Sequence, residues 1–399
     1  MRPTRVRLTR GIDRARLRAM AHQTDFEVII IGGGIAGASL AYFLGERGVT
    51  NVVLLEREAQ PAYHSTGRSA ASVVEWDAVP ALQELKAIGA AFLRHPPDGF
   101  CEHPVLIPSG ILVTFQEPLW TAAQAMVPML TERGTTAQVL SQGEVFERMP
   151  VLSPVYFDGG VWLPEDGRVD VHELLWSYLR HAGRRGVQHR WGVTVTGIRV
   201  ERGRCHAVLT ADGELTARWV VNAAGAWAGQ VAALAGAVPV PLTPHRRTIV
   251  TCAAPDGLDV RDWPLVSNES QHLYFAPESG GLLVCPMDET PMEPCDAQPD
   301  ELVVAQAVER LRKLAPRLAP KTLQRSWAGL RTFTPDRVLV VGEDPHVKGF
   351  FWLAGQGGCG IETSGAVGRI AADLLVDGRT DRFDASVLSP DRFAISGRA

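Results

Sequence analysis

The stretch FEVIIIGGGIAGASLAYFLGERGVTNVVLLE, residues 26–56, decides how the first part of this chain folds. It opens with an apolar run of strand length, residues 26–31, and continues through a glycine-rich turn into a segment of helical composition. A second apolar run, residues 52–55, ends in Glu56. The turn has the spacing G-x-G-x-x-G, and its glycines are Gly32, Gly34 and Gly37. Strand, glycine turn, helix, strand and acid in this order predict a βαβ unit that binds a dinucleotide.

Each part of this unit has a physical task. Gly32 permits the tight turn, Gly34 lets a pyrophosphate approach the backbone, and Gly37 lets the helix pack closely on the strand. The N-terminus of the helix carries partial positive charge and faces the phosphates. Glu56 follows Gly37 by nineteen residues and is predicted to accept hydrogen bonds from a ribose diol.

A second match to the glycine pattern stands near the end of the sequence. Gly355, Gly357 and Gly360 follow the strand-like run 350–354 and precede a segment of helical composition, 361–375. No further strand with a ribose-binding acid follows, so this segment is not a complete nucleotide-binding unit. We expect the loop and the helix N-terminus to lie against the far end of the same cofactor, where the helix dipole favours negative charge on a reduced flavin.

The composition excludes several other functions. The 40 basic and 44 acidic residues nearly balance, so the chain has no global cationic field to hold nucleic acid. The histidines lack H-x-H or H-x-x-x-H spacing and the cysteines lack a C-x-x-C pair, so no metal site is predicted. With 399 residues, two domains or one domain with an inserted lobe are expected. No apolar run is long enough to span a membrane. A cytoplasmic protein is expected, either free or peripheral to the inner face of the membrane.

The first 24 residues differ in composition from the rest. They carry seven arginines and a single acid, with no sustained apolar stretch, so they do not form a secretory signal. We expect a disordered extension, or an upstream start with Met20 as the natural initiator. An arginine-rich transit peptide is the alternative.

Four segments resemble the D-amino acid oxidase (DAO) superfamily. EREAQPAYHSTGRSAA, residues 56–71, looks like the flavin-contacting loop of that superfamily. VVNAAGAW, residues 220–227, is similar to its third nucleotide-domain strand, and residues 327–331 and 355–361 match its C-terminal flavin elements. Within the superfamily the chain most resembles bacterial FAD-dependent D-arginine dehydrogenase, which shares the short motifs at residues 100–104, 262–264 and 388–390.

The resemblance implies an α/β fold with two lobes. One is a Rossmann-like FAD-binding domain of the DAO and glutathione-reductase type, and the other is an inserted, mixed β-sheet domain that roofs the flavin. The boundaries expected for the FAD-binding domain are residues 25–105, 155–240 and 325–385; for the substrate-binding domain, 106–154 and 241–324; and for the C-terminal tail, 386–399. The residue pattern also predicts a helix over 170–182, strands over 193–200 and 281–285, and a turn at 158–160.

The resemblance also implies which residues contact FAD. Relatives that tether flavin covalently carry a cysteine near residues 329–336 or a T-W-H segment after the second strand. Neither occurs here, so noncovalent FAD is expected. The implied FAD contacts are Gly32, Gly34, Ile35, Ala36, Gly37, Glu56, Arg57, Ser65, Thr66, Gly67, Arg68, Ser69, Ala70, Ala71, Ser72, Val195, Gly357, Gly358, Cys359, Gly360, Ile361 and Glu362.

Two arginines and a tyrosine are the implied substrate ligands. An amino acid must have its carboxylate fixed, and a planar guanidinium binds it bidentately. The resemblance implies Arg247, Arg331 and Tyr274 for this role, with Gly358 supplying a backbone contact and Arg246 as the alternative to Arg247. Arg331 lies in an apolar setting with no acid within four residues, which also favours an anionic ligand.

The implied reaction is hydride transfer from the α-carbon of an amino acid to flavin, and the resemblance implies a D-amino acid. The resulting imino acid hydrolyses to a 2-oxo acid and ammonia. The electron acceptor stays open between a quinone, a dye and oxygen.

The side-chain end of the substrate site departs from the arginine-preferring relatives. They place histidine, threonine and tyrosine where this chain has Ser72, Val74 and Asp77. A cationic substrate side chain would therefore be met by Glu75, Asp77 or Glu362, or else the pocket is apolar. Two other functions stay open: a secondary-amine oxidase of the sarcosine or glycine oxidase kind, and a flavin-bearing subunit without its own substrate.

Overall fold

The predicted dinucleotide-binding unit forms the start of the fold. The computed structural model describes residues 25–394, so the extension predicted over residues 1–24 and the last residues of the predicted tail lie outside the described residues. Strand β1 (Phe26–Ile31), helix α2 (Ile35–Glu46) and strand β2 (Val52–Glu56) follow one another, and the two strands run parallel. The expected βαβ unit is therefore confirmed.

The glycine turn of this unit shows why two of its residues must be glycine. Gly32 has a φ of +118°, a conformation that side chains rarely allow. A Cβ at Gly37 would lie 2.0 Å from the carbonyl oxygen of Gly32. Helix α2 can therefore pack this closely on β1 only without a side chain at position 37.

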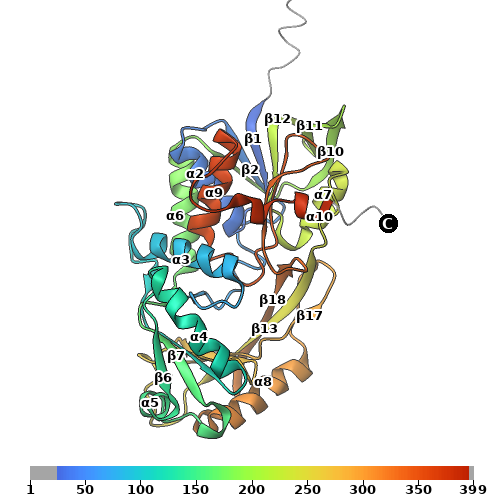
Figure 1. Ribbon diagram of the computed structural model, residues 1–399. Coiled ribbons are helices and arrows are strands. Elements are labelled where there is room, and N and C mark those ends of the chain that lie inside the picture. Colours follow the sequence, from blue (N-terminus) through green and yellow to red (C-terminus); the bar gives the residue numbers. More distant parts are fainter. Residues whose placement is uncertain (1–24, 395–399) are drawn as a thin grey trace, which may run out of the picture.

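The first sheet extends from this unit to eight strands (Figure 1). The other strands are β9 (Gln188–Trp191), β10 (Val195–Glu201), β11 (Arg204–Thr210), β12 (Gly213–Asn222), β19 (Val340–Glu343) and β20 (Phe350–Ala354). Their order is β10-β11-β12-β1-β2-β9, with β20 beside β12 and β19 beside β20. The strands β20, β12, β1, β2 and β9 run parallel. This is the arrangement of an α/β nucleotide-binding domain.

Helices cover both faces of this sheet (Figure 1). Besides α2 they are α6 (Val171–Arg184), α7 (Ala228–Ala235), α9 (Ser364–Asp377) and α10 (Asp391–Ala394), and α3 (Pro80–Arg94) packs against α9. In β1, Val28 and Ile30 share a core with α2, α6 and α9, whereas Ile29 and Ile31 share one with α7. Because both sets are buried, β1 has a continuous apolar sequence rather than an alternating one.

The second sheet has nine strands and lies in the other lobe. Its strands are β5 (Ile111–Phe115), β6 (Gln138–Ser141), β7 (Gly159–Leu163), β13 (Thr243–Ala253), β14 (Leu265–Asn268), β15 (Leu273–Glu278), β16 (Gly281–Cys285), β17 (Thr290–Pro291) and β18 (Leu323–Phe333). The order is β17-β13-β16-β15-β14-β5-β7-β6, and β18 pairs with β13. Helices α4 (Leu119–Glu132), α5 (Gln142–Arg148) and α8 (Glu301–Leu314) accompany it.

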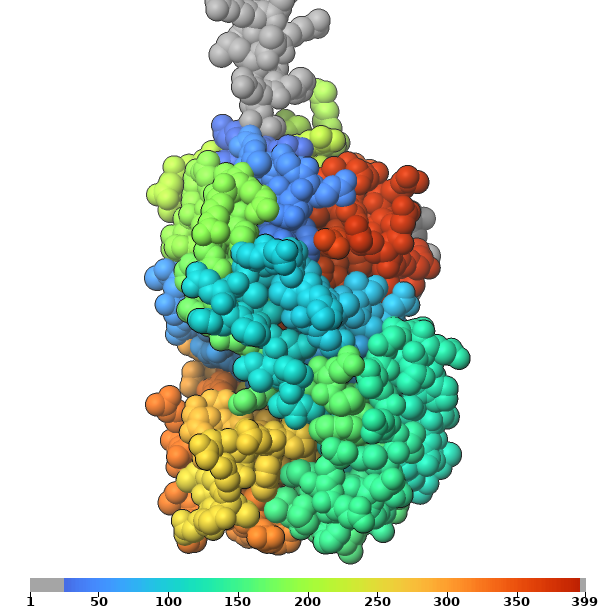
Figure 2. Space-filling model, turned by 90° about the vertical axis from the view of Figure 1, so that its left-hand side faces the viewer, coloured from blue at the N-terminus to red at the C-terminus, as the bar shows by residue number. Residues whose placement is uncertain are grey.

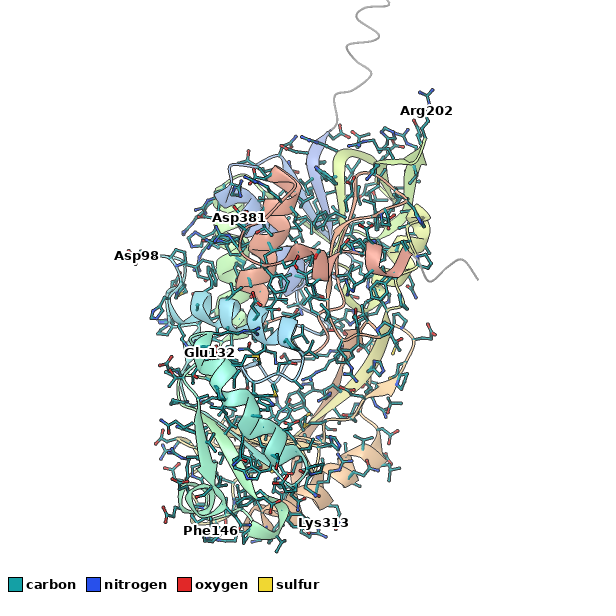
Figure 3. The ribbon with its side chains drawn as sticks, viewed as in Figure 1. Asp98, Glu132, Phe146, Arg202, Lys313 and Asp381 are labelled. Carbon is teal, nitrogen blue, oxygen red and sulfur yellow. The ribbon has the colours of Figure 1, made fainter. Side chains whose placement is uncertain are left out.

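The two lobes are each built from distant parts of the sequence. In Figure 2 the red C-terminal segment lies beside the blue N-terminal one in the upper lobe, and the teal, yellow and orange segments form the lower lobe. Figure 3 marks the two ends of the molecule, with Arg202 at the upper end and Phe146 and Lys313 at the lower end. The remaining elements are a small sheet of β3 (Ser72–Val73), β4 (Leu106–Ile107) and β8 (Gly167–Val169), and the 3₁₀ turns 154–156, 225–227, 316–318 and 385–388.

Two sequence predictions of local structure were wrong in their bounds. The turn predicted at 158–160 is the start of β7, and the ring of Trp120 lies 2.3 Å from where a Cβ at Gly159 would stand. That glycine therefore serves close packing and not a turn. The helix predicted over 361–375 begins at Ser364, because residues 361–363 form a tighter turn in which the N–H of Ser364 donates to the carbonyl of Ile361.

The strands at two expected domain boundaries pair within the second sheet. Strand β7 falls in the segment 155–240, yet it pairs with β5 and β6. Strand β18 begins just before the segment 325–385 and pairs along its length with β13. The division into domains at the expected residues remains a prediction, and these two strands belong to the sheet of the intervening segments.

Candidate functional site

A cavity of about 420 Å³ runs from the glycine turn after β1 to the ladder between β13 and β18. This size is typical of small-molecule sites in proteins. Its wall includes the loop after β2, the start of β10, the turn at 225–227 and the glycine loop before α9. The expected site residues that line it are Gly32, Gly34, Ile35, Ala36, Glu56, Arg57, Ser65, Thr66, Arg68, Ser69, Ala70, Val195, Arg247, Arg331, Gly357, Gly358, Gly360 and Ile361.

Seven other expected site residues do not line this cavity. They are Gly37, Gly67, Ala71, Ser72, Tyr274, Cys359 and Glu362. Gly67 closes a loop turn, since its N–H donates to the carbonyl of Ala62 at 2.9 Å. Ser72 pairs with Arg168 in the small sheet. Burial raises the pKa of the Cys359 thiol to about 12, so this cysteine is not a thiolate nucleophile.

Glu56 is held at one end of the cavity by the backbone of two turns. Its Oε2 accepts from the N–H of Gly33 at 2.7 Å, and its Oε1 accepts from the N–H of Glu58 at 2.9 Å. At the start of α2, the hydroxyl of Thr66 accepts from the N–H of Ile35 at 3.1 Å. A fixed carboxylate and a helix N-terminus thus stand close together, which suits a ribose and a pyrophosphate.

The loop after β2 is fastened to the second sheet. Ser65 donates from Oγ to the carbonyl of Leu330 at 2.6 Å. The guanidinium of Arg68 donates to the carbonyls of Ala297 and Ala328, both at 3.1 Å, and pairs with Asp296 at 2.6 Å. Through these contacts the guanidinium of Arg68 joins the loop after β2 to the second lobe.

Arg247 and Arg331 lie on one face of the antiparallel ladder between β13 and β18. In the register of this pair, Arg247 is opposite Gly329 and Arg331 is opposite His245. Residues two apart on a strand point to the same side, so the two arginines are diagonal neighbours. Both side chains line the cavity.

Arg246 points to the other face of the same strand. Its side chain meets Asp288 at 3.5 Å and Asp300 at 3.4 Å, and it does not line the cavity. The strand period of two decides between the adjacent arginines. Arg247 is the one that faces the cavity.

The two cavity arginines differ in their partners. Arg247 donates from Nη2 to Oε1 of Glu289 at 2.8 Å, and its buried Nε has no hydrogen-bond partner. Burial, together with the positive charge of Arg331, lowers the pKa of Arg247. Arg331 makes no ion pair with any residue in the range 25–394, and its Nη1 lies 2.6 Å from where a Cβ at Gly358 would stand. Two cations with one carboxylate between them favour a further anion.

Tyr274 stands behind these arginines on β15, which is separated from β13 by β16. It packs in one core cluster with Ile249 and Cys285. Burial raises the pKa of its phenol, although the charges of Arg331 and Arg247 oppose the rise. The phenol therefore keeps its proton and remains a hydrogen-bond donor at neutral pH.

The acids proposed to meet a cationic substrate already have cations of their own. Nζ of Lys86 lies 2.8 Å from Asp77 and 3.2 Å from Glu362. Glu75 is buried and accepts hydrogen bonds from Arg94 and Thr135. None of the three carboxylates lines the cavity.

Sequence reasoning missed three features of this region. Lys86 lies on the buried face of α3, which Leu82 and Gly89 share. A lysine at a position that the helical period assigns to the buried face was the signal that could have identified it. The stacking of Arg57 on Trp227, with the guanidinium carbon 3.8 Å from the ring centroid, had no sequence signal. Glu289 had no sequence signal either, because its partner Arg247 is 42 residues away in the sequence.

A doubly wound sheet whose cavity ends under a second sheet with two arginines defines a flavin-dependent oxidoreductase. The chain belongs to the family of FAD dependent oxidoreductases (DAO), whose model matches residues 27–374. FAD is thus its cofactor, and the expected fold class is confirmed. Among residues 25–394, no helix is long and apolar enough to cross a membrane, and no group of three metal-ligating side chains occurs.

Two curated proteins illustrate what this chain is similar to. Mitochondrial sarcosine dehydrogenase of Mus musculus is 27% identical over 376 residues, which are 89% of this chain and 40% of that protein. The mitochondrial pyruvate dehydrogenase phosphatase regulatory subunit of Mus musculus is 25% identical, over 91% of this chain and 43% of that protein. The chain thus spans about two fifths of the length of these curated relatives.

Among solved structures, the L-proline dehydrogenase from P. horikoshii superposes with a TM-score of 0.84. It is 22% identical, and the match covers 94% of this chain and 99% of that one. None of these three proteins is a D-arginine dehydrogenase, so the family is confirmed and the finer resemblance stays a prediction.

Proposed function

We propose that the protein oxidises the C–N bond of a small α-amino acid, with a hydride passing from the carbon next to nitrogen to FAD. The observation that carries the proposal is the pair Arg247 and Arg331, two guanidiniums on one face of a ladder at the end of the cavity. Guanidiniums bind carboxylates bidentately and fix their plane. A carboxylate held there leaves the neighbouring C–N bond in a defined orientation.

The chain's own residues orient the substrate. Arg331 and Arg247 hold the carboxylate, and the buried, protonated phenol of Tyr274 lies near them within the second sheet. FAD, when bound, supplies the two-electron oxidation as a hydride acceptor. We assign no side-chain base, so the substrate amine reacts in its neutral form and the rate rises with pH. The imine product hydrolyses after release.

The substrate side chain is uncharged in this proposal. Glu75 is paired with Arg94, and Asp77 and Glu362 are paired with the buried Lys86, so the three carboxylates are not free for an arginine side chain. Val74 and Trp76 pack with the cluster that contains Tyr274, and make this region apolar. The names of two relatives, sarcosine dehydrogenase and L-proline dehydrogenase, agree with a secondary amino acid without a charged side chain. D-amino acids with uncharged side chains remain within the proposal.

Anaerobic reduction of the bound flavin tests this function. Wild-type protein with proline, sarcosine, and D- and L-alanine should lose its flavin absorbance with at least one of them. Arg331→Met keeps the side-chain volume and removes the charge. It should lower kcat/KM for the amino acid by about 100-fold, since a charge-assisted bidentate contact is worth about 3 kcal/mol.

The control substrate and the control variant isolate the carboxylate contact. Pyrrolidine is proline without its carboxylate, so Arg331→Met should change its reaction far less. Arg246→Met removes an arginine from the opposite face of the same strand and should leave both reactions within a few-fold of wild type. An equal loss of kcat/KM with proline and pyrrolidine would show that Arg331 has a structural role, and would refute its role in binding the substrate carboxylate.

A flavin-bearing subunit without its own substrate is the second candidate. The likeness to a phosphatase regulatory subunit supports it. Tightly bound FAD that no amino acid or amine reduces would establish this alternative and refute the catalytic proposal.

A further inference from the structure

We propose that Glu289 restricts the substrate site to ligands with a single carboxylate. This inference rests on the proposed function, because it concerns the anion that Arg247 and Arg331 hold. It adds a specificity-determining residue on a loop that neither motif nor resemblance pointed to.

Glu289 bridges the cavity and the surface. Its Oε1 accepts from Arg247 Nη2 at 2.8 Å, and its Oε2 accepts from Arg337 Nη2 at 2.6 Å. Its side chain is 30% exposed, whereas that of Arg247 is 6% exposed. Glu289 is therefore a partly exposed carboxylate that meets the cavity residue Arg247 from the solvent side.

The backbone around Glu289 is fixed, so the carboxylate cannot easily move away. The adjacent Asp288 accepts from the N–H of Thr248 at 2.6 Å and from its hydroxyl at 2.9 Å. On the outer side, Arg337 stacks on Phe333, with its guanidinium carbon 4.2 Å from the ring centroid. Both contacts anchor Glu289 to the β13–β18 ladder.

The balance of charge follows from these contacts. Arg247 and Arg331 contribute two positive charges to the end of the cavity, and Glu289 contributes one negative charge. Partial burial opposes ionisation, but hydrogen bonds from Arg337 and the charge of Arg247 lower the pKa of Glu289, so it is ionised at neutral pH. Arg337, the other partner of Glu289, is 47% exposed, so solvent screens its charge. Counting the two cavity arginines and Glu289, one uncompensated positive charge remains, and a single carboxylate neutralises it.

A second carboxylate on the ligand would meet Glu289. To use Arg247 it would have to approach the guanidinium whose Nη2 is already 2.8 Å from Oε1 of Glu289. Like charges about 5 Å apart at an effective dielectric constant of about 20 repel strongly enough to weaken binding by at least tenfold. Without Glu289 the two arginines would instead suit a dianion.

Binding of simple anions to the FAD-loaded protein tests the inference independently of turnover. Acetate and malonate are titrated at pH 7.5, and the change in flavin absorbance gives each dissociation constant. Wild-type protein should bind acetate more tightly than malonate. Glu289→Gln should shift the ratio of the two affinities toward malonate by at least tenfold.

Two further variants separate charge from structure. Glu293→Gln makes the same change at an exposed acid just beyond β17 and should leave the ratio unchanged. Arg337→Met loosens the outer contact but keeps the carboxylate, so the ratio should stay within about threefold of wild type. A shift in Arg337→Met as large as that in Glu289→Gln would assign the exclusion to loop structure and overturn the inference.

Three outcomes with wild-type protein and Glu289→Gln would also overturn the inference. They are an unchanged ratio in Glu289→Gln, a wild-type preference for malonate, and no binding of either anion to wild type. The preference of wild-type protein between acetate and malonate tests the inference even if Glu289→Gln fails to fold. Selective anion binding without flavin reduction by amino acids would count against the proposed function and leave the assignment of Glu289 standing.

Discussion

Replacing Lys86 by methionine should destabilise the fold near the end of the cavity. The change keeps most of the side-chain volume and removes an ammonium whose side chain is only 7% exposed. Asp77 and Glu362 then lose their shared cation, while Glu362 keeps only the N–H of Val74, at 2.7 Å, as a donor. The variant thus leaves two carboxylates packed together without a counter-charge.

The magnitude follows from the two distances. At an effective dielectric constant of about 20, charges 2.8 and 3.2 Å apart attract by about 6 and 5 kcal/mol. The cost of removing these ions from water offsets much of this attraction, and breaking a buried pair by removing one partner costs about 3–5 kcal/mol. We therefore expect a loss of about 3–5 kcal/mol in the free energy of unfolding at pH 8.

The loss should depend on pH. Burial raises the pKa of Glu362, and the charge of Lys86 opposes that rise, so the pKa is higher still in the variant. A carboxyl whose folded pKa lies above its unfolded value of about 4.3 stabilises the fold below that value, and this contribution is lost as pH rises through the folded pKa. The difference between variant and wild type should therefore grow from pH 5 to pH 8. Burial works against the charged Lys86, yet Glu362 and Asp77 hold its pKa well above the usual value, so wild type keeps its contribution over this range.

Urea unfolding of the FAD-loaded proteins at pH 5, 6.5 and 8 measures the effect. Lys313→Met is the matched control, because Lys313 is also a helix lysine near a glutamate but is 52% exposed and lies at the far end of the second lobe (Figure 3). It should change stability by less than about 0.5 kcal/mol. Adding Glu362→Gln to Lys86→Met should recover part of the loss. A Lys86→Met variant within 1 kcal/mol of wild type at pH 8, with no trend in pH, would refute the reasoning.

Two further predictions concern the nucleotide-binding unit. Glu56→Ala should raise the dissociation constant of FAD by roughly 10- to 100-fold, since a hydrogen bond to a charged group is worth about 1.5–3 kcal/mol, and fluorescence titration with FAD measures it; unchanged affinity would exclude Glu56 as a ribose anchor. Gly37→Ala should abolish FAD retention during purification, because its Cβ would lie 2.0 Å from the carbonyl oxygen of Gly32, and a variant with the wild-type flavin-to-protein ratio would show that the helix can shift at little cost.

The sequence determined those features that depend on a short segment. The order of strand, glycine turn and helix is encoded within residues 26–56, where the close contact between Gly37 and Gly32 joins residues five apart in the sequence. The same holds for the length of β16, which the structure gives as the expected 281–285. The apolar setting of Arg331 likewise singled it out, and the structure leaves that guanidinium without an ion pair among residues 25–394.

The tertiary structure alone decided which charged groups remain free for a ligand. Glu362 is joined to Val74, 288 residues away in the sequence, and shares Lys86 with Asp77. No local pattern reports such a contact, because the pairing of charges depends on which helices and loops the fold brings together. For the same reason, the choice between Arg246 and Arg247 required the register of β13 on β18. The role of Glu289 could be inferred only from its hydrogen bond with Arg247 in the folded chain. Sequence names the ionisable groups, but their net charge in the cavity depends on distances that only the folded chain sets.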